Sequence, residues 1–336
     1  MADRIASILS GERYVFVCAL ILALINLFAF VGFEKGYDTQ WTLITMQVCA
    51  LIWVFGVGMR ASFPSMPGLY IFEAVALITF IGIQAALASA TIAPYTGAYA
   101  DDTLARMDSI LMPFVTWPQA IDWLITHPRI FRYANYVYTS INWQLPVLLG
   151  ILVLLGRGQT LRVLALGSGI SAIIGIAIFA LMPAQGAYLH YGYTPSDLPD
   201  LMIGLPFEFP VILESLKNGS MDQLSHESVS GLISFPSFHA SSAIVLAMVW
   251  REVKWVGVPM MALNAGVALS AMPIGSHYFS DIVAGLITGY VSYSWACKLI
   301  SEKEKSWVSS SATASSKPTA RARIRSWSTR TVTMRA

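Results

Sequence analysis

The stretch VLALGSGISAIIGIAIFALM, residues Val163–Met182, decides the fold class. It contains no charged side chain, and an α-helix of about 20 residues is long enough to cross the hydrocarbon core of a bilayer. Seven further runs on either side of it are similarly apolar. The eight predicted spans are Tyr14–Phe33, Trp41–Val57, Gly68–Ala93, Tyr133–Leu155, Val163–Met182, Leu232–Trp250, Trp255–Met272 and Phe279–Ile300. We therefore expect an all-α, polytopic integral membrane protein with about eight transmembrane helices.

The composition agrees with a chain that lies mostly in lipid. Of the 336 residues, 56% are hydrophobic and 12% are charged, and the mean hydropathy is +0.61. Soluble domains carry about 25% charged residues, so this chain could not cover the surface of a compact globule in water. A disordered chain, a secreted disulfide scaffold and an ordinary cytosolic enzyme are excluded. Cys18, Cys49 and Cys297 lie in apolar runs without metal-ligand spacing, and we expect them to be small core residues.

The distribution of charge predicts the orientation of the spans. With the N-terminus placed in the cytoplasm, 16 of the 21 Lys and Arg residues fall in inside segments and five fall outside, whereas twelve acidic residues fall outside. This asymmetry follows the positive-inside rule. We expect a protein of the bacterial inner (cytoplasmic) membrane, with both termini cytoplasmic and the acidic loops on the outer, periplasmic side.

Three segments outside the spans have distinct compositions. The segment Pro94–Arg132 is apolar at helical spacing with Trp117 and Trp123, which favours a helix lying in the membrane interface. The segment Ala184–Gly231 is rich in Pro, Gly and acidic residues and is expected to form a loop or cap over the outer face. We predict three parts: an N-terminal transmembrane hairpin over 1–67, a membrane core over 68–300, and a basic, disordered cytoplasmic tail over 301–336.

Two of the five histidines have unusual surroundings. His239 lies in SFPSFHASSAIV and His277 lies in SAMPIGSHYFSDIVAG, each at the outer start of a predicted span. The free N–H groups at a helix start favour binding of a phosphate or another anion. His277 and Asp281 are four residues apart and therefore share a helix face. A carboxylate there can hold one ring nitrogen and turn the other toward a substrate, so His277 is a candidate nucleophile or base.

The chain between the two histidines brings them to the same side of the membrane. His277 follows His239 by 38 residues, and one span, the short turn REVK and a returning span lie between them. We expect the two histidines to share one site. The remaining histidines, His127, His190 and His226, are expected to be ordinary loop residues, and Tyr278 is as well explained by an interfacial aromatic as by a substrate contact.

These motifs resemble those of the type 2 phosphatidic acid phosphatase superfamily over about 234–285. Their form is nearest the inositol phosphorylceramide synthase-like branch, whose signatures read Pro-Ser-x-His and His-Tyr-x-x-Asp. Relative to the usual phosphatase signatures, Phe238 replaces a Gly and Ala271 replaces an Arg. The first signature, Lys with Arg-Pro seven residues later, has no counterpart, and PAQGAY at Pro183–Tyr188 occupies its expected place.

The resemblance implies a six-helix bundle core and metal-independent phosphoryl transfer through a phosphohistidine. It implies that His277 is the nucleophile, that His239 is the acid toward the leaving alkoxide, and that Asp281 orients His277. No cofactor and no metal are implied. The candidates for phosphate or head-group binding are Ser237, Ser276, Gln185 and Tyr188.

The residues leave the reaction and two rival functions open. A lipid phosphate or phosphodiester would enter from the bilayer, and water as acceptor makes the protein a phosphatase, whereas a hydroxyl acceptor makes it a phosphotransferase. No nucleic-acid partner is indicated. One rival is a transporter or lipid-flipping protein that uses Glu73, the one acid within a span, and the histidines as proton relays. The other is a non-catalytic protein that only binds lipid head groups. This alternative stays open because Ala271 stands where the phosphatase signature has an Arg.

Overall fold

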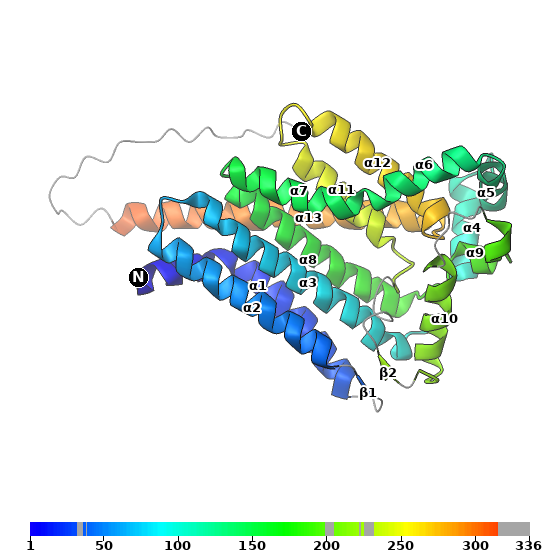
Figure 1. Ribbon diagram of the computed structural model, residues 1–336, viewed down its shortest axis with the longest axis horizontal. Coiled ribbons are helices and arrows are strands. Elements are labelled where there is room, and N and C mark those ends of the chain that lie inside the picture. The colour runs from blue at the N-terminus through cyan, green and yellow to red at the C-terminus, as the bar shows by residue number, and fades with distance from the viewer. Residues whose placement is uncertain (32–35, 38, 199–204, 222, 225–231, 315–336) are drawn as a thin grey trace. The chain divides into compact units, whose positions relative to one another are not determined.

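The computed structural model describes residues 1–31, 36–37, 39–198, 205–221, 223–224 and 232–314 (Figure 1). The chain divides into a compact unit, Met1–Ile300, and a second unit, Ser301–Ala336. In chain order the helices and strands are α1 (Ala2–Val31), β1 (Gly36–Tyr37), α2 (Thr39–Ser62), η1 (Pro67–Leu69), α3 (Tyr70–Ile92), η2 (Ala93–Tyr95), α4 (Asp101–Leu111), α5 (Trp117–Ile125), α6 (Pro128–Thr139), α7 (Ile141–Leu154), α8 (Gly158–Leu181), α9 (Ala187–His190), η3 (Pro195–Asp197), α10 (Leu205–Lys217), β2 (Gln223–Leu224), α11 (Phe238–Trp250), α12 (Gly257–Ile274) and α13 (Phe279–Ala314).

The all-helical, polytopic architecture expected from the sequence is confirmed. Among the described residues, six helical segments are long and apolar enough to cross a membrane, where the sequence predicted about eight. Helices α6 and α7 together form one of the six, over Pro128–Leu154. The two predicted spans that fall short are α11 and α13. Helix α11 begins only at Phe238 and has 13 residues, and the first half of α13 mixes Asp281 and several Ser, Thr and Tyr residues with its apolar ones.

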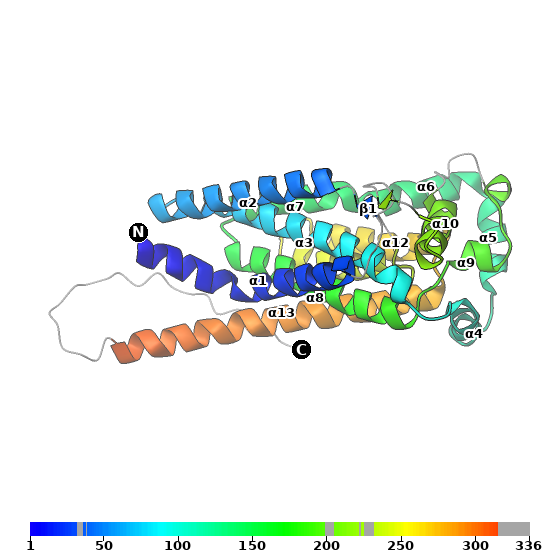
Figure 2. The ribbon, with the colours of Figure 1, turned by 90° about the horizontal axis from the view of Figure 1, so that it is seen from below.

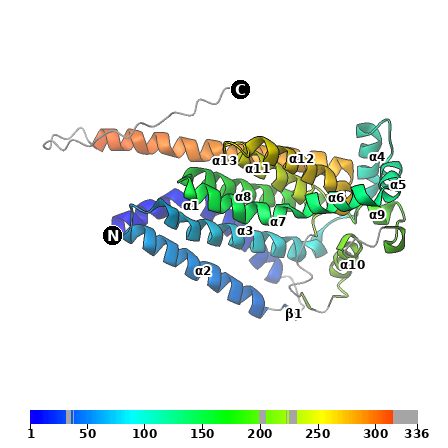
Figure 3. The same cartoon turned by 45° about the horizontal axis from the view of Figure 1, so that its top comes forward.

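The long helices of the first unit lie side by side, and the short ones gather at one end (Figures 1 and 2). Helices α4, α5, α9 and α10 lie at the end where α11 and α13 begin, as a third view also shows (Figure 3). Helix α1 begins at the opposite end. Strands β1 and β2 pair in parallel and connect the α1–α2 loop to the segment after α10. The helix starts that carry His239 and Asp281 are therefore covered by the short helices.

Two glycines let α13 approach α11 closely. A Cβ atom at Gly285 would overlap the carbonyl oxygen of Ser237, and one at Gly289 would overlap that of Ser241. Small residues four apart are a common means of close helix packing in membranes, because they bring two backbones together. This packing holds the first turns of α11 and α13 against each other, and these turns carry the two predicted catalytic segments.

Buried ion pairs hold the other end of the bundle together. Arg60 Nε lies 2.9 Å from Glu73 Oε1, and Arg162 Nε lies 2.9 Å from Glu12 Oε1. The Tyr70 hydroxyl donates to Glu12 Oε2 at 3.2 Å. Glu73 has no exposed surface, so this carboxylate is a paired charge in a span.

The segments outside the spans differ in part from the sequence predictions. The structure forms two helices, α4 and α5, in place of one interfacial helix over Pro94–Arg132, and Trp117 is 1% exposed and packs inside the protein. The segment expected to be a loop or cap contains the helix α10. Helix α13 continues to Ala314, so the first part of the predicted disordered tail is helical, while 315–336 lies outside the described residues.

Candidate active site

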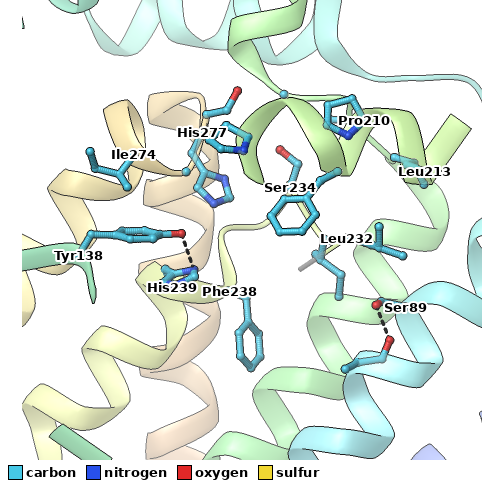
Figure 4. A pocket seen from close by; sticks show the side chains of 18 of the residues that line it. Ser89, Tyr138, Pro210, Leu213, Leu232, Ser234, Phe238, His239, Ile274 and His277 are labelled. Atoms are coloured by element: carbon cyan, nitrogen blue, oxygen red, sulfur yellow. Dashed lines mark hydrogen bonds between the residues drawn. The ribbon is translucent and has the colours of Figure 1, made fainter. Parts of the chain in front are cut away.

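A cavity of about 510 Å³ opens beside the starts of α11 and α13 (Figure 4). His239 and His277 lie at one part of its wall, and much of the remaining wall is formed by small or apolar residues of α3, α8 and α10, including Gly82, Ala85 and Ala172. Among the described residues that line it, none is Asp, Glu, Lys or Arg. The cavity thus combines a polar region with an apolar one, as a site for an amphiphile requires.

His277 is held from behind by Asp281. Its Nδ1 lies 3.1 Å from Asp281 Oδ2, and the same oxygen accepts the backbone N–H of Tyr278 at 3.0 Å and the hydroxyl of Ser234 at 3.4 Å. Asp281 is fully buried, and the side chain of His277 is 7% exposed. With Nδ1–H donated to the carboxylate, Nε2 carries the lone pair, and His277 contributes to the cavity wall.

Burial keeps His277 neutral. His277 lies in the loop between α12 and α13, and loss of hydration lowers the pKa of its imidazole to about 4, although a hydrogen bond with the Ser234 backbone raises this pKa. An imidazole with a pKa near 4 has a free lone pair at neutral pH. His277 therefore has the protonation state that a nucleophile needs.

His239 has a different partner, Tyr138 of α6. The Tyr138 hydroxyl lies 2.9 Å from His239 Nδ1, and the two rings stack with centroids 4.1 Å apart (Figure 4). A phenol can donate to Nδ1 of a neutral imidazole and accept from Nδ1–H of an imidazolium. Tyr138 thus fits both protonation states of His239 and leaves Nε2 free to exchange a proton.

Two aspartates of α4 fasten the loops around His277. Asp108 accepts the backbone N–H groups of Phe279 and Ser280 at 2.8 and 2.7 Å, which are among the free donors at the start of α13. Asp101 accepts the backbone N–H groups of Gln185 and Gly186, each at 3.0 Å, and the Tyr278 hydroxyl at 3.0 Å. These contacts join α4 to both loops of the cavity.

Trp117 of α5 completes this support. Its Nε1–H donates to the carbonyl of His277 at 2.9 Å, and its ring packs against Tyr188, Tyr191 and Tyr193. The sequence suggested a tryptophan at the membrane interface. In the structure Trp117 is instead buried inside the protein. A buried indole N–H needs a hydrogen-bond acceptor, and the His277 carbonyl is that acceptor.

Comparison with protein families gives a match in the same part of the chain. A family model described as the PAP2 superfamily matches residues 102–295, which is more than half of the sequence and runs from α4 into α13. The chain belongs to the PAP2 superfamily. Comparisons with curated proteins and with solved structures found no match. Membership identifies a PAP2 membrane phosphatase-type enzyme, and members of the superfamily are generally metal-independent phosphatases.

The PAP2 cavity includes four of the seven predicted site residues. His239, His277, Ser276 and Gln185 line it, and Asp281 lies directly behind His277. Ser276 is 3% exposed and its hydroxyl accepts the backbone N–H of Tyr188 at 2.9 Å, so this side chain also holds the two loops of the cavity together.

Ser237 and Tyr188 have structural contacts in this PAP2 protein. Ser237 is fully buried; its hydroxyl caps α11 by accepting the N–H of Ala240 at 3.3 Å, and its own N–H donates to the Asp281 carbonyl. Its backbone N–H is therefore not free for phosphate. Tyr188 is fully buried and donates its hydroxyl to the Pro273 carbonyl at 2.5 Å. Neither residue lines the cavity, so we assign neither to substrate binding.

The other histidines lie outside the cavity wall. His127 Nδ1 lies 2.7 Å from the Trp123 carbonyl, and His190, the last residue of α9, has its Nδ1 3.8 Å from Asp102. His226 lies outside the described residues. Within the described part of the chain, no group of three or more His, Cys, Asp or Glu residues could hold a metal ion.

Sequence reasoning missed Tyr138, Asp101 and Asp108. Tyr138 lies 101 residues before His239 and carries no motif of its own. Asp101 and Asp108 are seven residues apart, two helical turns, and so share a face of α4, which is a signal that the sequence contains. Their partners lie more than 80 residues away, so nothing local indicated what that face would bind.

Proposed function

We propose that the protein is a phosphatase or head-group phosphotransferase of membrane lipids that acts through a phosphohistidine on His277. The substrate is an amphiphile with a phosphate or phosphodiester head group, which enters the cavity from the bilayer. The observation that carries the proposal is the arrangement of His277, bound to Asp281, beside His239 in one partly apolar cavity.

The first half of the reaction cleaves the bond to the leaving group. His277 Nε2 attacks phosphorus and forms a P–N bond, while the P–O bond to the lipid alkoxide breaks. His239 enters this step as the imidazolium, which the anionic phosphate beside it favours, and gives its Nε2 proton to the departing oxygen, so the product leaves as an alcohol. Asp281 stabilises the charge that develops on the His277 ring, as the carboxylate of a catalytic triad does.

The second half of the reaction regenerates the enzyme. His239, now without its Nε2 proton, removes a proton from an incoming hydroxyl, whose oxygen forms a bond to phosphorus while the P–N bond to His277 breaks. Water as the acceptor gives hydrolysis, and an alcohol gives transfer. No metal ion is required in either half, because the proton transfers and the two imidazoles supply the catalysis.

Transfer is a second candidate reaction. It is supported by the motif form PSFH at 236–239 and HYFSD at 277–281, which resembles the inositol phosphorylceramide synthase-like branch. We further propose that the core of the protein covers 68–300, that it lies in the bacterial inner membrane, and that the cavity faces the outer, periplasmic side. The excess of Lys and Arg in the opposite loops supports this orientation.

A turnover and trapping experiment tests the proposal. Purified protein in detergent is given labelled lipid phosphates and phosphodiesters, with and without hydroxyl acceptors and with a strong chelator. We expect chelator-resistant turnover and an acid-labile, base-stable phosphoenzyme with its label on His277. A non-catalytic lipid-binding protein would give no turnover at all.

Two variants separate the roles of the histidines. His277→Ala should abolish activity on all substrates, because every turnover needs the nucleophile. His239→Ala should nearly abolish activity on alkyl phosphates and retain part of it on an aryl phosphate, whose leaving group departs without a proton. Label on His239, or a phosphoenzyme formed by His277→Ala, would reverse the assignment. Activity restored only by Mg or Zn after chelation would contradict the metal-free mechanism.

A further inference from the structure

A stripe of polar side chains runs along one wall of the cavity. Asn135, Tyr138, Thr139 and Asn142 follow one another at helical spacing across the end of α6 and the start of α7, and all four line the cavity. They belong to the candidate membrane span Pro128–Leu154. Polar side chains are costly in a span and are retained where they have a partner.

Two members of the stripe have partners in the protein and two do not. The Tyr138 hydroxyl pairs with His239, and the Thr139 hydroxyl donates to the Asn135 carbonyl at 2.9 Å. The side-chain amides of Asn135 and Asn142 have no hydrogen-bond partner within the described part of the chain. Each amide offers two N–H donors and one carbonyl acceptor to whatever occupies the cavity.

The two amides lie on opposite sides of Tyr138 along the helix. Asn142 is four residues beyond Tyr138, about 6 Å along the axis in the direction in which α7 continues into the bundle. Gly82, Ala85 and Ala172 contribute apolar wall of the same cavity from α3 and α8. Asn135 lies before Tyr138, toward the end where the short helices gather. Asn142 is therefore the amide on the bundle side of the catalytic pair.

We propose that Asn142 binds the carbonyl group of an ester or amide linkage in the lipid substrate. This inference rests on the proposed function. A lipid with its phosphate at His277 and His239 and its chains along the apolar wall has its linkage groups between the two, a few bonds from phosphorus. The carbonyl oxygen of this linkage is uncharged and needs a hydrogen-bond donor, and no Lys or Arg lines this cavity among the described residues. The side-chain N–H of Asn142 can donate that hydrogen bond.

A matched pair of lipids tests this subsite. Dioleoyl phosphatidic acid and its dioleyl ether analogue have the same phosphate and chain length, and only the first has carbonyl groups. We expect the wild-type kcat/KM for the ester to exceed that for the ether by about threefold to tenfold, the value of one hydrogen bond. Asn142→Leu and Asn142→Ala should bring this ratio to about one. Asn135→Leu is the matched control and should keep the wild-type ratio.

The outcomes separate the inference from the proposed function. Turnover of phenyl phosphate, which has no linkage group, reports that each variant is folded. A wild-type ratio near one, a ratio unchanged in both Asn142 variants, or an equal loss in Asn135→Leu would overturn the subsite while leaving the phosphatase intact. Absence of phosphate release from both lipids by the wild type would overturn the proposed function and the subsite with it.

Discussion

At the scale of single residues, the two histidines differ in the side chain that pairs with their Nδ1 atom. His277 has a buried carboxylate, Asp281, at Nδ1, and His239 has a neutral phenol, Tyr138, at the equivalent atom. A carboxylate stabilises an imidazole that gains positive charge, as a nucleophile does when its nitrogen bonds to phosphorus. A phenol can donate or accept and therefore suits a ring whose proton leaves and returns. The partners thus support the same division of roles as the proposed mechanism.

Tyr138→Phe should weaken the acid step selectively. The variant keeps the ring that stacks on His239 and removes the hydroxyl, so we expect kcat on an alkyl phosphate to fall by about tenfold, as for one lost hydrogen bond. Activity on an aryl phosphate should change much less, because that leaving group needs no proton. Tyr136→Phe, at an exposed tyrosine of the same helix, is the control. Equal losses on both substrates would show that Tyr138 acts on something other than the proton transfer.

The pKa of His277 predicts the acid limit of phosphoenzyme formation. This pKa is lowered to about 4, so the neutral, nucleophilic imidazole persists as the pH falls and is lost only when the pH passes below about 4. The rate of the 4-nitrophenol burst from methyl 4-nitrophenyl phosphate, a diester of constant charge in this range, should be flat from about pH 8 to pH 5 when the phenol is read after an alkaline quench. A decline centred near pH 6.5 would mean that His277 titrates as an exposed histidine.

At the scale of helices and loops, the site depends on how closely α11 and α13 pack. Gly285 and Gly289 bring the backbone of α13 against Ser237 and Ser241 of α11. The Ser237 N–H then donates to the Asp281 carbonyl at 3.0 Å, which joins the two helix starts directly. Asp108 adds a contact from α4 to the first turn of α13. The position of Asp281, the partner of the proposed nucleophile His277, is therefore set by packing one to two turns further along α13.

Gly289→Ala should lower both stability and activity. The added methyl group would overlap the Ser241 carbonyl and push α13 away from α11, and overpacking of this kind costs about 1–3 kcal/mol. Gly150→Ala on α7 is the matched control, because a Cβ there meets nothing within 4 Å and Ala is the better helix former. Thermal unfolding in detergent, followed with phosphatase activity, should separate the two variants. Equal melting temperatures would contradict the close approach of the helices.

At the scale of the whole molecule, the buried Arg–Glu ion pairs and the two candidate histidines lie at opposite ends of the long helices. The buried pairs Arg60–Glu73 and Arg162–Glu12 lie at one end of the first unit, and the histidines lie at the other. Glu73 does not line the cavity of the histidines. A proton relay from Glu73 to the histidines, as a transporter would need, therefore has no support in these contacts.

Cysteine labelling tests the orientation of the molecule in the membrane. With Cys18, Cys49 and Cys297 replaced, single cysteines are introduced at Ser220 and at Ser309. The predicted topology places Ser220 outside and Ser309 in the cytoplasm, because 16 of the 21 Lys and Arg residues then face the cytoplasm. An impermeant reagent should label intact cells at residue 220 and spare residue 309. The reverse pattern would invert the topology, and labelling at both would place them on one side.

Short-range patterns were enough to predict the fold class and the contact between His277 and Asp281. Apolar runs such as Val163–Met182 indicate membrane helices wherever they occur in a sequence. The bilayer itself requires a span to be apolar, long enough and helical, and this requirement does not depend on the rest of the chain. The pairing of His277 with Asp281 was predictable for the same kind of reason, since four residues are one helical turn. The shared cavity of His239 and His277 followed from a single helical hairpin.

The partners of these residues became evident from the packed structure alone. Tyr138 reaches His239 across 101 residues, Trp117 reaches the His277 carbonyl across 160, and Asp108 reaches Phe279 across 171. No period or motif relates positions so far apart, because their contacts depend on how whole helices pack. Packing likewise buried Trp117 and paired the Ser237 N–H with the Asp281 carbonyl. The local sequence around these two residues fits an exposed Trp117 and a free Ser237 N–H equally well.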